Sequence, residues 1–229
     1  MSEQSAPAVL AARMGRREGA PTRNLAHVAL VYRPGDGPGA SLLLRHFGFE
    51  VVDMGPHRET DEHWYAVFVD AGSTFEDNLV YLLPASPAQQ ELEALVVRSR
   101  GADAELSAAW ARFDEFSAGD PERSFHFGFT YGSFDELEAA ALGVLEAGAP
   151  GGRLAGRVWR RNVFRPTPGV DPAIDERLGR SPLVTDDDRR CLAPNGFQLW
   201  FGTDLLASNL LALGQVLEMD HVFARAARD

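Results

Sequence analysis

The chain has 229 residues, of which 45% are hydrophobic and 24% charged, so it is long enough for one or two globular domains with buried cores. All 22 basic residues are Arg, which excludes Schiff-base catalysis, a lysine-bound pyridoxal and a phosphate-binding loop that depends on Lys. The net charge of −11 argues against a nucleic-acid-binding surface, and the single cysteine, Cys191, excludes an internal disulfide and a multi-cysteine metal site.

No targeting or membrane-spanning segment is expected. The most apolar window, residues 205–223, is interrupted by charged residues such as Glu218 and Asp220, and Glu3 stands where a signal peptide would be positive. A lone cysteine fits a reducing compartment, so a cytoplasmic protein is predicted. The abundance of Ala, Gly and Arg without Lys suggests a GC-rich bacterial genome.

The first part of the chain predicts a βαβββ module over residues 23–84. Residues 1–22 have no hydrophobic period and are expected to form a flexible tail. An apolar strand then leads through Pro and Gly turn signals into a short helix that ends at Gly48, and three more apolar strands follow. The predicted elements are a strand at 24–32, a helix at 40–47 and strands at 49–54, 64–70 and 78–83.

Residues 85–118 are predicted to be a helical connector. Ser86 and Gln89 form a capping box with Pro87 at the first helical position, and a helix to about residue 97 follows. Gly101 is expected to break this helix. Apolar residues at helical spacing then predict a second helix that ends near residue 116.

The pattern then repeats, which predicts a second βαβββ module over residues 119–203. An apolar strand precedes a capping box at Ser133 and Glu136, and the helix that starts there ends at Gly148. The predicted elements are strands at 124–131, 157–165, 189–192 and 197–201 and a helix at 133–148, with a long loop at 166–187.

The last segment, residues 204–229, is predicted to be a C-terminal helix. Four leucines recur three or four residues apart, which is the spacing of one helix face: Leu206, Leu210, Leu213 and Leu217. On such a helix Glu218 and His221 lie three residues apart and share a face, where a surface or interface pair is expected.

Spacing within the two modules agrees. His27 lies 21 residues before Gly48, and His126 lies 22 residues before Gly148. Each βαβββ copy has one open sheet face, which is buried when two copies combine within one chain or when the protein dimerises. A two-module chain, with a homodimer as the other arrangement, is therefore expected.

Four stretches of the two modules carry a family resemblance: NLAHVALVYRPGD, LLLRHFGFEVVDMG, HFGFTYGSFDELEAAALGVLEAGAP and CLAPNGFQLWF. Their order and spacing resemble the vicinal oxygen chelate superfamily, which includes glyoxalase I, extradiol dioxygenases and bleomycin-resistance proteins. The resemblance covers about residues 24–83 and 124–202. It implies an α+β fold in which two βαβββ modules form a cup around one site.

In that superfamily the metal ligands come from the first and last strands of a module, with His or Gln on the first and usually Glu on the last. The resemblance therefore implies a divalent metal cofactor, namely Fe, Mn, Ni, Co or Zn, bound by imidazole and carboxylate groups. His27 and His126 match the first-strand positions. The alternative for each is a core histidine with one hydrogen-bond partner.

The last-strand positions depart from the family pattern. In the first module the position falls on Val80 or Tyr81, and in the second it falls on Trp200 or Gln198, depending on register. Gln198 is the predicted third metal ligand, as a neutral oxygen donor, while Trp200 and Tyr81 are predicted to contact substrate. No carboxylate stands at either place, which argues against tight metal binding.

A cluster of arginines supplies one more predicted substrate contact. Strand alternation places Arg157, Arg161 and Arg165 on one face, where Arg161 is expected to bind an anionic group of the substrate. Surface salt bridges are the alternative for these residues. Cys191 is expected to pack in the core, although neighbouring arginines would lower its pKa.

Two functions of different classes fit these features. The first is a metal-dependent lyase, isomerase or dioxygenase that acts on a small oxygen-rich or aromatic molecule, with no general base identified. The alternative is a metal-free protein that binds and sequesters a small molecule, for which the acidic net charge suits a cationic ligand. Whether the chain is an enzyme is open at this point. In both cases the expected partner is a small molecule and neither a nucleic acid nor a membrane.

Overall fold

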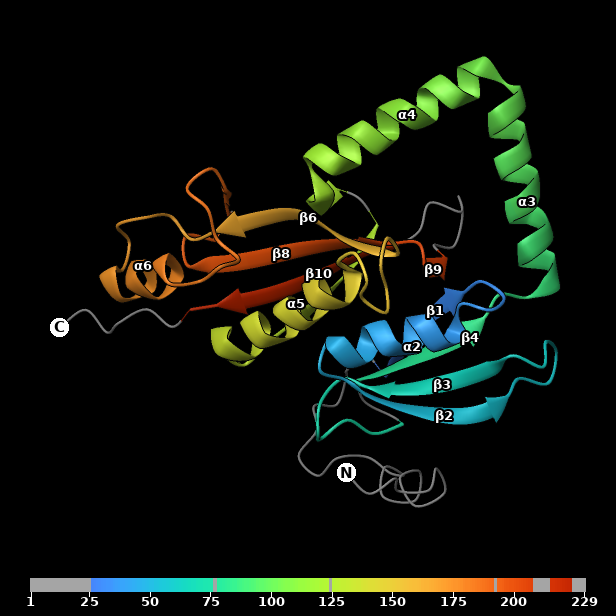
Figure 1. Ribbon diagram of the computed structural model, residues 1–229, viewed down its shortest axis with the longest axis horizontal. Helices are drawn as coiled ribbons and strands as arrows, with labels where there is room; N and C mark the ends of the chain where they lie inside the picture. The colour runs from blue at the N-terminus through green and yellow to red at the C-terminus, as the bar shows by residue number, and fades with distance from the viewer. Residues whose placement is uncertain (1–25, 76–77, 124, 192, 208–214, 224–229) are drawn as a thin grey trace. The chain divides into compact units, whose positions relative to one another are not determined.

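The computed structural model describes residues 26–75, 78–123, 125–191, 193–207 and 215–223. Contacts divide these residues into two compact units, and each is described by itself. The first unit contains the described residues up to Ala102 together with residues 205–207, and the second contains those within 103–204 and 215–223 (Figure 1). The chain thus leaves the second unit for a short stretch near residue 206 and then returns to it.

The first unit is a βαβββ module, as predicted. Its sheet has the strand order β2-β3-β4-β1-β9, in which β1 and β4 are parallel and the other neighbours are antiparallel. The helix α2 lies along one face of this sheet (Figure 1). The elements are β1 (His27–Tyr32), α2 (Gly37–His46), β2 (Glu50–Pro56), β3 (His63–Phe68), β4 (Leu79–Pro84) and β9 (Leu206–Ala207).

Apolar residues of β1 explain how α2 is held. Leu30 and Tyr32 are buried on the same face of the strand. Gly37 starts the helix directly over Tyr32, because a Cβ at residue 37 would lie 2.9 Å from the tyrosine ring. Since side chains alternate along a strand, the opposite face of β1 carries His27 and Ala29.

The second unit repeats the module with the same strand order. Its sheet runs β5-β10-β8-β6-β7, in which β5 and β10 are parallel, β8 is antiparallel to both β10 and β6, and the edge strand β7 is parallel to β6. Strands β5, β6, β8 and β10 therefore correspond to β1, β2, β3 and β4. The elements are β5 (His126–Thr130), α5 (Phe134–Gly148), β6 (Val158–Arg165), α6 (Pro172–Gly179), β7 (Arg189–Arg190), β8 (Gly196–Thr203) and β10 (Gln215–Val222).

Helix α5 covers one face of the second sheet. Its predicted capping box is present, because the Ser133 side chain accepts from the Glu136 backbone and the Glu136 side chain accepts from the Ser133 backbone. At the start of the helix Phe134 packs edge-on against Phe197 of β8, with ring centroids 4.9 Å apart. The apolar residues of β8 and α5 thus form the core of this unit.

Two helices, α3 (Pro87–Ala102) and α4 (Ala104–Gly119), occupy the predicted connector, one in each unit. Helix α3 continues through Gly101, and the break falls instead at Asp103, whose side chain accepts hydrogen bonds from the first turn of α4. A short 3-10 helix, η1 (Pro121–Arg123), then leads to β5. None of the helices in the described residues is both long and apolar enough to cross a membrane.

The predicted loop at 166–187 contains the helix α6. Asp171 caps it by accepting a hydrogen bond from the backbone of Ala173. Ile174 and Leu178 bury one side of the helix, and Leu183 is buried beyond it. The high content of Pro, Gly and charge conceals this helix in the sequence, because its apolar residues are few.

The C-terminal helix predicted for residues 204–229 is wrong in the described part of that segment. β9 pairs with β1 in the first unit, and residues 215–222 form β10, the fourth strand of the second module. Leu210 and Leu213, on which the prediction partly depends, lie outside the described residues. β8, which is predicted to be the last strand of the second module, is its third strand. The stretch at 189–192, which is predicted to be the third strand, contains only the two-residue edge strand β7.

Strand pairing overrides the leucine spacing in this segment. β10 takes the central place between β5 and β8, where both edges of its backbone are hydrogen-bonded. Its side chains alternate, with Leu217, Met219 and His221 on the side of α5 and Val216, Glu218 and Asp220 on the other. Two acids at alternate positions hide this period of two in the sequence, because they suggest an exposed helix turn.

Candidate functional site

Polar side chains from three neighbouring strands meet on the face of the second sheet that is turned away from α5. They come from β5, β8 and β10, and the ladder pairs Gly128 with Glu218 and Glu218 with Trp200. The members of this polar cluster are His126, Gln198, Glu218 and Asp220. Glu218 and His221, predicted to share a helix face, point instead to opposite faces of β10.

Two polar side chains converge on Glu218. The Nε2 atom of His126 lies 3.4 Å from its Oε2 atom, and Gln198 Nε2 donates to its Oε1 atom at 2.6 Å. Gln198 Nε2 also donates to Oε1 of Glu122 in η1 at 2.6 Å. The Glu218 carboxyl group thus has a polar partner on each oxygen, although its side chain is only 5% exposed.

Gly128 provides the space for the two carboxyl groups of the cluster. A Cβ at this residue would lie 2.9 Å from Glu218 Oε2 and 3.1 Å from Asp220 Oδ2. Both distances are shorter than ordinary van der Waals contact, so a larger residue would displace one or both carboxyl groups.

The carboxyl groups are held close together and away from water. Burial, followed by the neighbouring Asp220 carboxyl group, raises the pKa of Glu218 from its usual 4.5 to about 9. Burial also raises the pKa of Asp220, and the negative charge of Glu122 adds to this shift. A cation at the cluster would favour the ionised forms, because an opposite charge lowers the pKa of a carboxyl group.

Trp200 forms a wall beside His126. The two rings meet edge to face with centroids 4.7 Å apart, and Phe164 of β6 also packs against the indole at 6.2 Å. Trp200 is fully buried. Its Nε1 atom lacks a hydrogen-bond partner among the described residues, as does Oδ1 of Asn162, its neighbour in the ladder. Trp200 supports His126 here, and its predicted contact with substrate stays a prediction.

The first module carries an aromatic residue where the second carries Glu218. His27 stands opposite the first residue of β4, and Ala29 stands opposite Tyr81. In the second module His126 stands opposite Val216, and Gly128, two residues later, stands opposite Glu218. The same register therefore makes Tyr81 the counterpart of Glu218.

Around His27 the first sheet is aromatic and apolar. The rings of His27 and Tyr81 have centroids 4.9 Å apart, and those of Trp64 and Tyr81 lie 6.0 Å apart. Tyr81 also packs on a buried cluster formed by Val52, Ala66, Phe68 and Leu79. Among the residues that the structure describes, these contacts include no acidic side chain. The first sheet thus presents rings where the second presents carboxyl groups.

The structure corrects the last-strand register of the second module. Gln198 and Trp200 lie on β8, the third strand, so their predicted place on the last strand is wrong. The last strand is β10, and its residue beside His126 is Glu218. The carboxylate that is missing from the predicted positions is therefore present on β10. The alternation of residues 216–222 is the signal that would have found it, together with the fourth strand that a βαβββ module requires.

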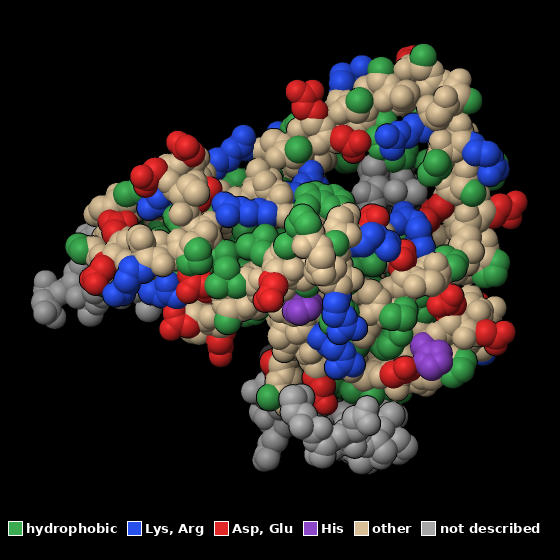
Figure 2. Space-filling view, viewed as in Figure 1, with side chains coloured by type: hydrophobic (Ala, Val, Ile, Leu, Met, Phe, Trp, Pro, Cys, Tyr) green, Lys and Arg blue, Asp and Glu red, His purple; other side chains and the backbone are tan. Residues whose placement is uncertain are grey.

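The arginines in β6 and directly before it do not gather at the polar cluster in the contacts that the described residues make. Arg157 pairs with Asp204 at 2.7 Å. Arg161 is the extra residue of a bulge in β6. Burial lowers the pKa of its guanidinium group, and the nearby Asp114 only partly opposes this shift. The bulge breaks the alternation on which the predicted arginine face depends. Figure 2 shows basic and acidic side chains interspersed on the visible side, and substrate binding by Arg161 stays a prediction.

Cys191 contacts the polar cluster through Gln198. Its Sγ atom donates to Gln198 Oε1 at 3.2 Å. Burial raises the pKa of the thiol, which is the opposite of the lowering that nearby arginines would produce. The cysteine is therefore a neutral hydrogen-bonding group in the core.

The possible metal-donor atoms of the polar cluster contact one another. In the described part of the chain, no three His, Cys, Asp or Glu side chains stand ready-made around a metal position. In the cluster, His126 and Glu218 contact each other, and Gln198 directs its Nε2 atom toward the acids. One imidazole and two carboxyl groups are nevertheless the donor types that borderline divalent metals prefer.

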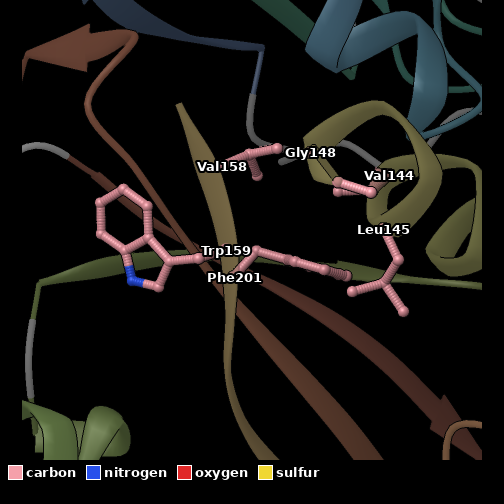
Figure 3. Close-up of a pocket in the computed structure, with 7 residues that line it drawn as sticks. Val144, Leu145, Gly148, Val158, Trp159 and Phe201 are labelled. Atoms are coloured by element: carbon pink, nitrogen blue, oxygen red, sulfur yellow. The ribbon is translucent and has the colours of Figure 1, made fainter. Parts of the chain in front are cut away.

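A separate hollow of about 200 Å³ opens on the second unit beside α5 (Figure 3). Figure 3 shows the Trp159 indole turned away from the side chains of Val144 and Leu145. The lining residues are Val144, Leu145, Gly148, Ala149, Val158, Trp159 and Phe201. No titratable side chain belongs to this lining, so the hollow offers no group for acid–base or metal chemistry.

Comparison with known proteins adds one structural similarity. No family model matches the chain, and no curated protein matches it. A solved structure described as a glyoxalase/bleomycin resistance protein/dioxygenase family enzyme from Burkholderia phytofirmans PsJN is similar, with 11% sequence identity and a TM-score of 0.33. The match covers 88% of this chain and 100% of that chain. A likeness at this level carries no argument about activity, and the fold assignment rests on the two matching strand orders.

Proposed function

We propose that the protein binds a divalent metal at the polar cluster of the second sheet and acts there on a small oxygen-bearing molecule. His126 and Glu218 would hold the metal, with Asp220 as the neighbouring carboxylate. The observation that carries the proposal is the 3.4 Å contact between His126 Nε2 and Glu218 Oε2. It joins an imidazole on the first strand of a module to a carboxyl group on the last.

The chemistry of the cluster fits such a metal. Imidazole nitrogen and carboxylate oxygen are the donors that Zn, Fe, Mn, Ni and Co accept in proteins. The carboxyl groups of Glu218 and Asp220 lie close together over Gly128, which together with burial raises the pKa of Glu218, and a bound cation would favour the ionised forms. Binding requires Glu218 to exchange one of its present partners, because His126 and Gln198 contact both of its oxygens.

A metal bound here supplies a Lewis acid that polarises an oxygen of the substrate. The residues of the chain have separate roles around it. Trp200 holds the His126 ring by its edge contact, and Gln198 orients the Glu218 carboxyl group. We assign the acceptance of a substrate proton to Asp220, which is less buried than Glu218. We assign the reaction to the lyase, isomerase or dioxygenase class.

Several sequence predictions enter the proposal in changed form. His126 is preferred to His27 as the metal ligand, because His126 contacts a carboxyl group and His27 contacts aromatic rings. Gln198 is proposed to orient Glu218, because its Nε2 and not its Oε1 faces the acids. Tyr81 and Arg161 stay predicted substrate contacts, and the cytoplasmic location and the homodimer stay predictions.

Calorimetric titration of untagged, chelator-treated protein with Zn²⁺ and Co²⁺ tests the proposal. The wild type is expected to bind one equivalent. His126→Ala and Glu218→Gln are each expected to weaken binding by roughly tenfold or more, because each removes a metal ligand. His27→Ala and Tyr81→Phe change the equivalent positions of the first module and are expected to keep the wild-type affinity.

The proposal fails if both second-module variants are folded, as circular dichroism shows, and bind either metal as tightly as the wild type does. It also fails if the wild type binds neither metal. A weaker affinity in the first-module variants alone would place the site on the other sheet.

A metal-free protein that sequesters a cationic small molecule is the second candidate. The hydrogen bonds from Gln198 to Glu122 and Glu218 favour it, because they satisfy these acids without a metal. Absence of heat with both metals, together with binding of an aromatic ammonium ion that Glu218→Gln weakens, would support this function over the first.

A further inference from the structure

A series of polar contacts links Cys191 to the proposed metal ligands Glu218 and His126. The Cys191 thiol donates to Gln198 Oε1 at 3.2 Å, and Gln198 Nε2 donates to Glu218 Oε1 at 2.6 Å. The other oxygen of Glu218 lies 3.4 Å from His126 Nε2. The four residues come from the segment before β8 and from strands β8, β10 and β5, so the series crosses the middle of the sheet.

We propose that Cys191 is a positioning residue for Glu218 and acts through the Gln198 amide. An amide side chain has an accepting end and a donating end of nearly the same size, so its direction depends on its neighbours. A thiol proton at Oε1 holds the accepting end toward Cys191. The donating end then faces Glu218 and Glu122, where it stabilises two acids instead of repelling them.

The backbone fixes the thiol at this place. Cys191 donates its backbone N–H to Arg165 at the end of β6, with a distance of 2.9 Å. Gly196, the first residue of β8, packs against the sulfur so closely that a Cβ there would lie 2.8 Å from Sγ. Cys191 itself is buried. The segment before β8 is thereby docked on the strand that carries Gln198.

This role rests on the proposed function in one respect, since the carboxyl group that is positioned is the one proposed to bind metal. The positioning itself does not need a metal. Without the thiol, Gln198 Oε1 loses its donor and only the two bonds of Nε2 hold the amide, so Glu218 is expected to lose its Nε2 donor for part of the time. Serine at residue 191 keeps a donor at the same place and should restore the orientation.

The test follows the side-chain amide of Gln198 by NMR in the full-length, ¹⁵N-labelled protein without metal. Gln198→Glu identifies the signals by their loss. Cys191→Ala is expected to speed solvent exchange of the Nε2 protons by about threefold or more, which is the effect of losing a modest hydrogen bond. Cys191→Ser is expected to keep the wild-type rate.

Val163→Ala is the matched control, because it trims a buried β6 residue paired with Leu199 rather than with Gln198. It should lower the melting temperature without changing Nε2 exchange. The positioning role is overturned by unchanged exchange in folded Cys191→Ala, and equally by the same increase in Val163→Ala. If exchange rises in Cys191→Ala alone while the wild type binds neither Zn²⁺ nor Co²⁺, the positioning role holds and the proposed metal function fails.

Discussion

The two modules have the same strand order and the same register, but their corresponding sheet faces differ in chemistry. His27 meets the rings of the first sheet, whereas His126 meets the carboxyl group of Glu218. The faces covered by α2 and α5 are apolar in both units, because they hold each module together. The other faces do not hold these helices, so their side chains can differ between the modules. A histidine on such a strand becomes a candidate ligand through its neighbours and not through its position alone.

The difference extends to the third strand of each sheet. Ala66 stands opposite Tyr81 in the first sheet, and Trp200 stands opposite Glu218 in the second. The large aromatic side chain thus lies on the last strand in one module and on the third in the other. Each histidine thus contacts a large aromatic ring, Tyr81 or Trp200, and only in the second module does the last strand carry a carboxyl group at this position.

The largest expected effect concerns that aromatic bulk. Trp200→Ala should lower the free energy of unfolding of the second unit by about 3–5 kcal/mol, because it leaves a cavity beside His126 and Phe164. Trp64→Ala in the first unit should cost clearly less, since Trp64 is only partly buried. Hydrogen exchange of β10 and β4 amides measures the two losses separately. Equal losses would show that the two faces are packed alike.

The next effect is a dependence of stability on pH. Because the pKa of Glu218 is raised from 4.5 to about 9 in the folded state, the folded protein holds a proton that the unfolded chain releases. Its contribution to stability is complete below pH 4.5 and is lost as the pH rises toward 9, at up to about 1.4 kcal/mol per pH unit.

Glu218→Gln should flatten this dependence, because the amide does not titrate, and Tyr81→Phe should leave it unchanged. Urea unfolding between pH 5 and pH 8, with amides of β10 as the probe, measures the slope. A slope in Glu218→Gln equal to that of the wild type would show that another group is responsible.

A smaller effect is expected at the position opposite Glu218. Gly128→Ala should destabilise the second unit by about 1–3 kcal/mol and weaken metal binding, because its Cβ would overlap the two carboxyl groups. Ala29→Gly at the counterpart should cost only about 0.5–1 kcal/mol, through backbone entropy. Unfolding curves of both variants decide this. A neutral Gly128→Ala would mean that the carboxyl groups do not depend on this space.

The smallest effect compares the two helix starts. Ser133→Ala should destabilise α5 by about 1 kcal/mol, because it removes a capping box. Asp36→Ala should cost less at the start of α2, where the Asp36 side chain makes no capping hydrogen bond. Thermal unfolding of the two variants compares them, and a larger loss in Asp36→Ala would reverse the expected order.

Most of the fold follows from local signals in the sequence. The first module and the strand–helix start of the second are predicted by apolar runs, by glycines such as Gly48 and Gly148, and by the capping box at Ser133. These signals act over a few residues and do not depend on the pairing of distant strands. The prediction fails at β10, whose conformation is decided by its place between β5 and β8.

The candidate site is only half predictable for the same reason. His126 follows from the repeat of the first strand. Glu218 lies more than ninety residues further along the chain, on a strand with an uninformative pattern, and nothing local connects the two. Only strand pairing, which brings Gly128 opposite Glu218, shows that they meet.

The measurement that tests the central claim most directly follows the imidazole nitrogens of the six histidines by NMR as Zn²⁺ is added to the metal-free protein. If the polar face of the second sheet is the metal site, the Nε2 signal of His126 shifts with the first equivalent, while the nitrogens of His27 keep their metal-free positions. A shift at His27 with none at His126, or equal shifts at both, would contradict the assignment of the site to the second module.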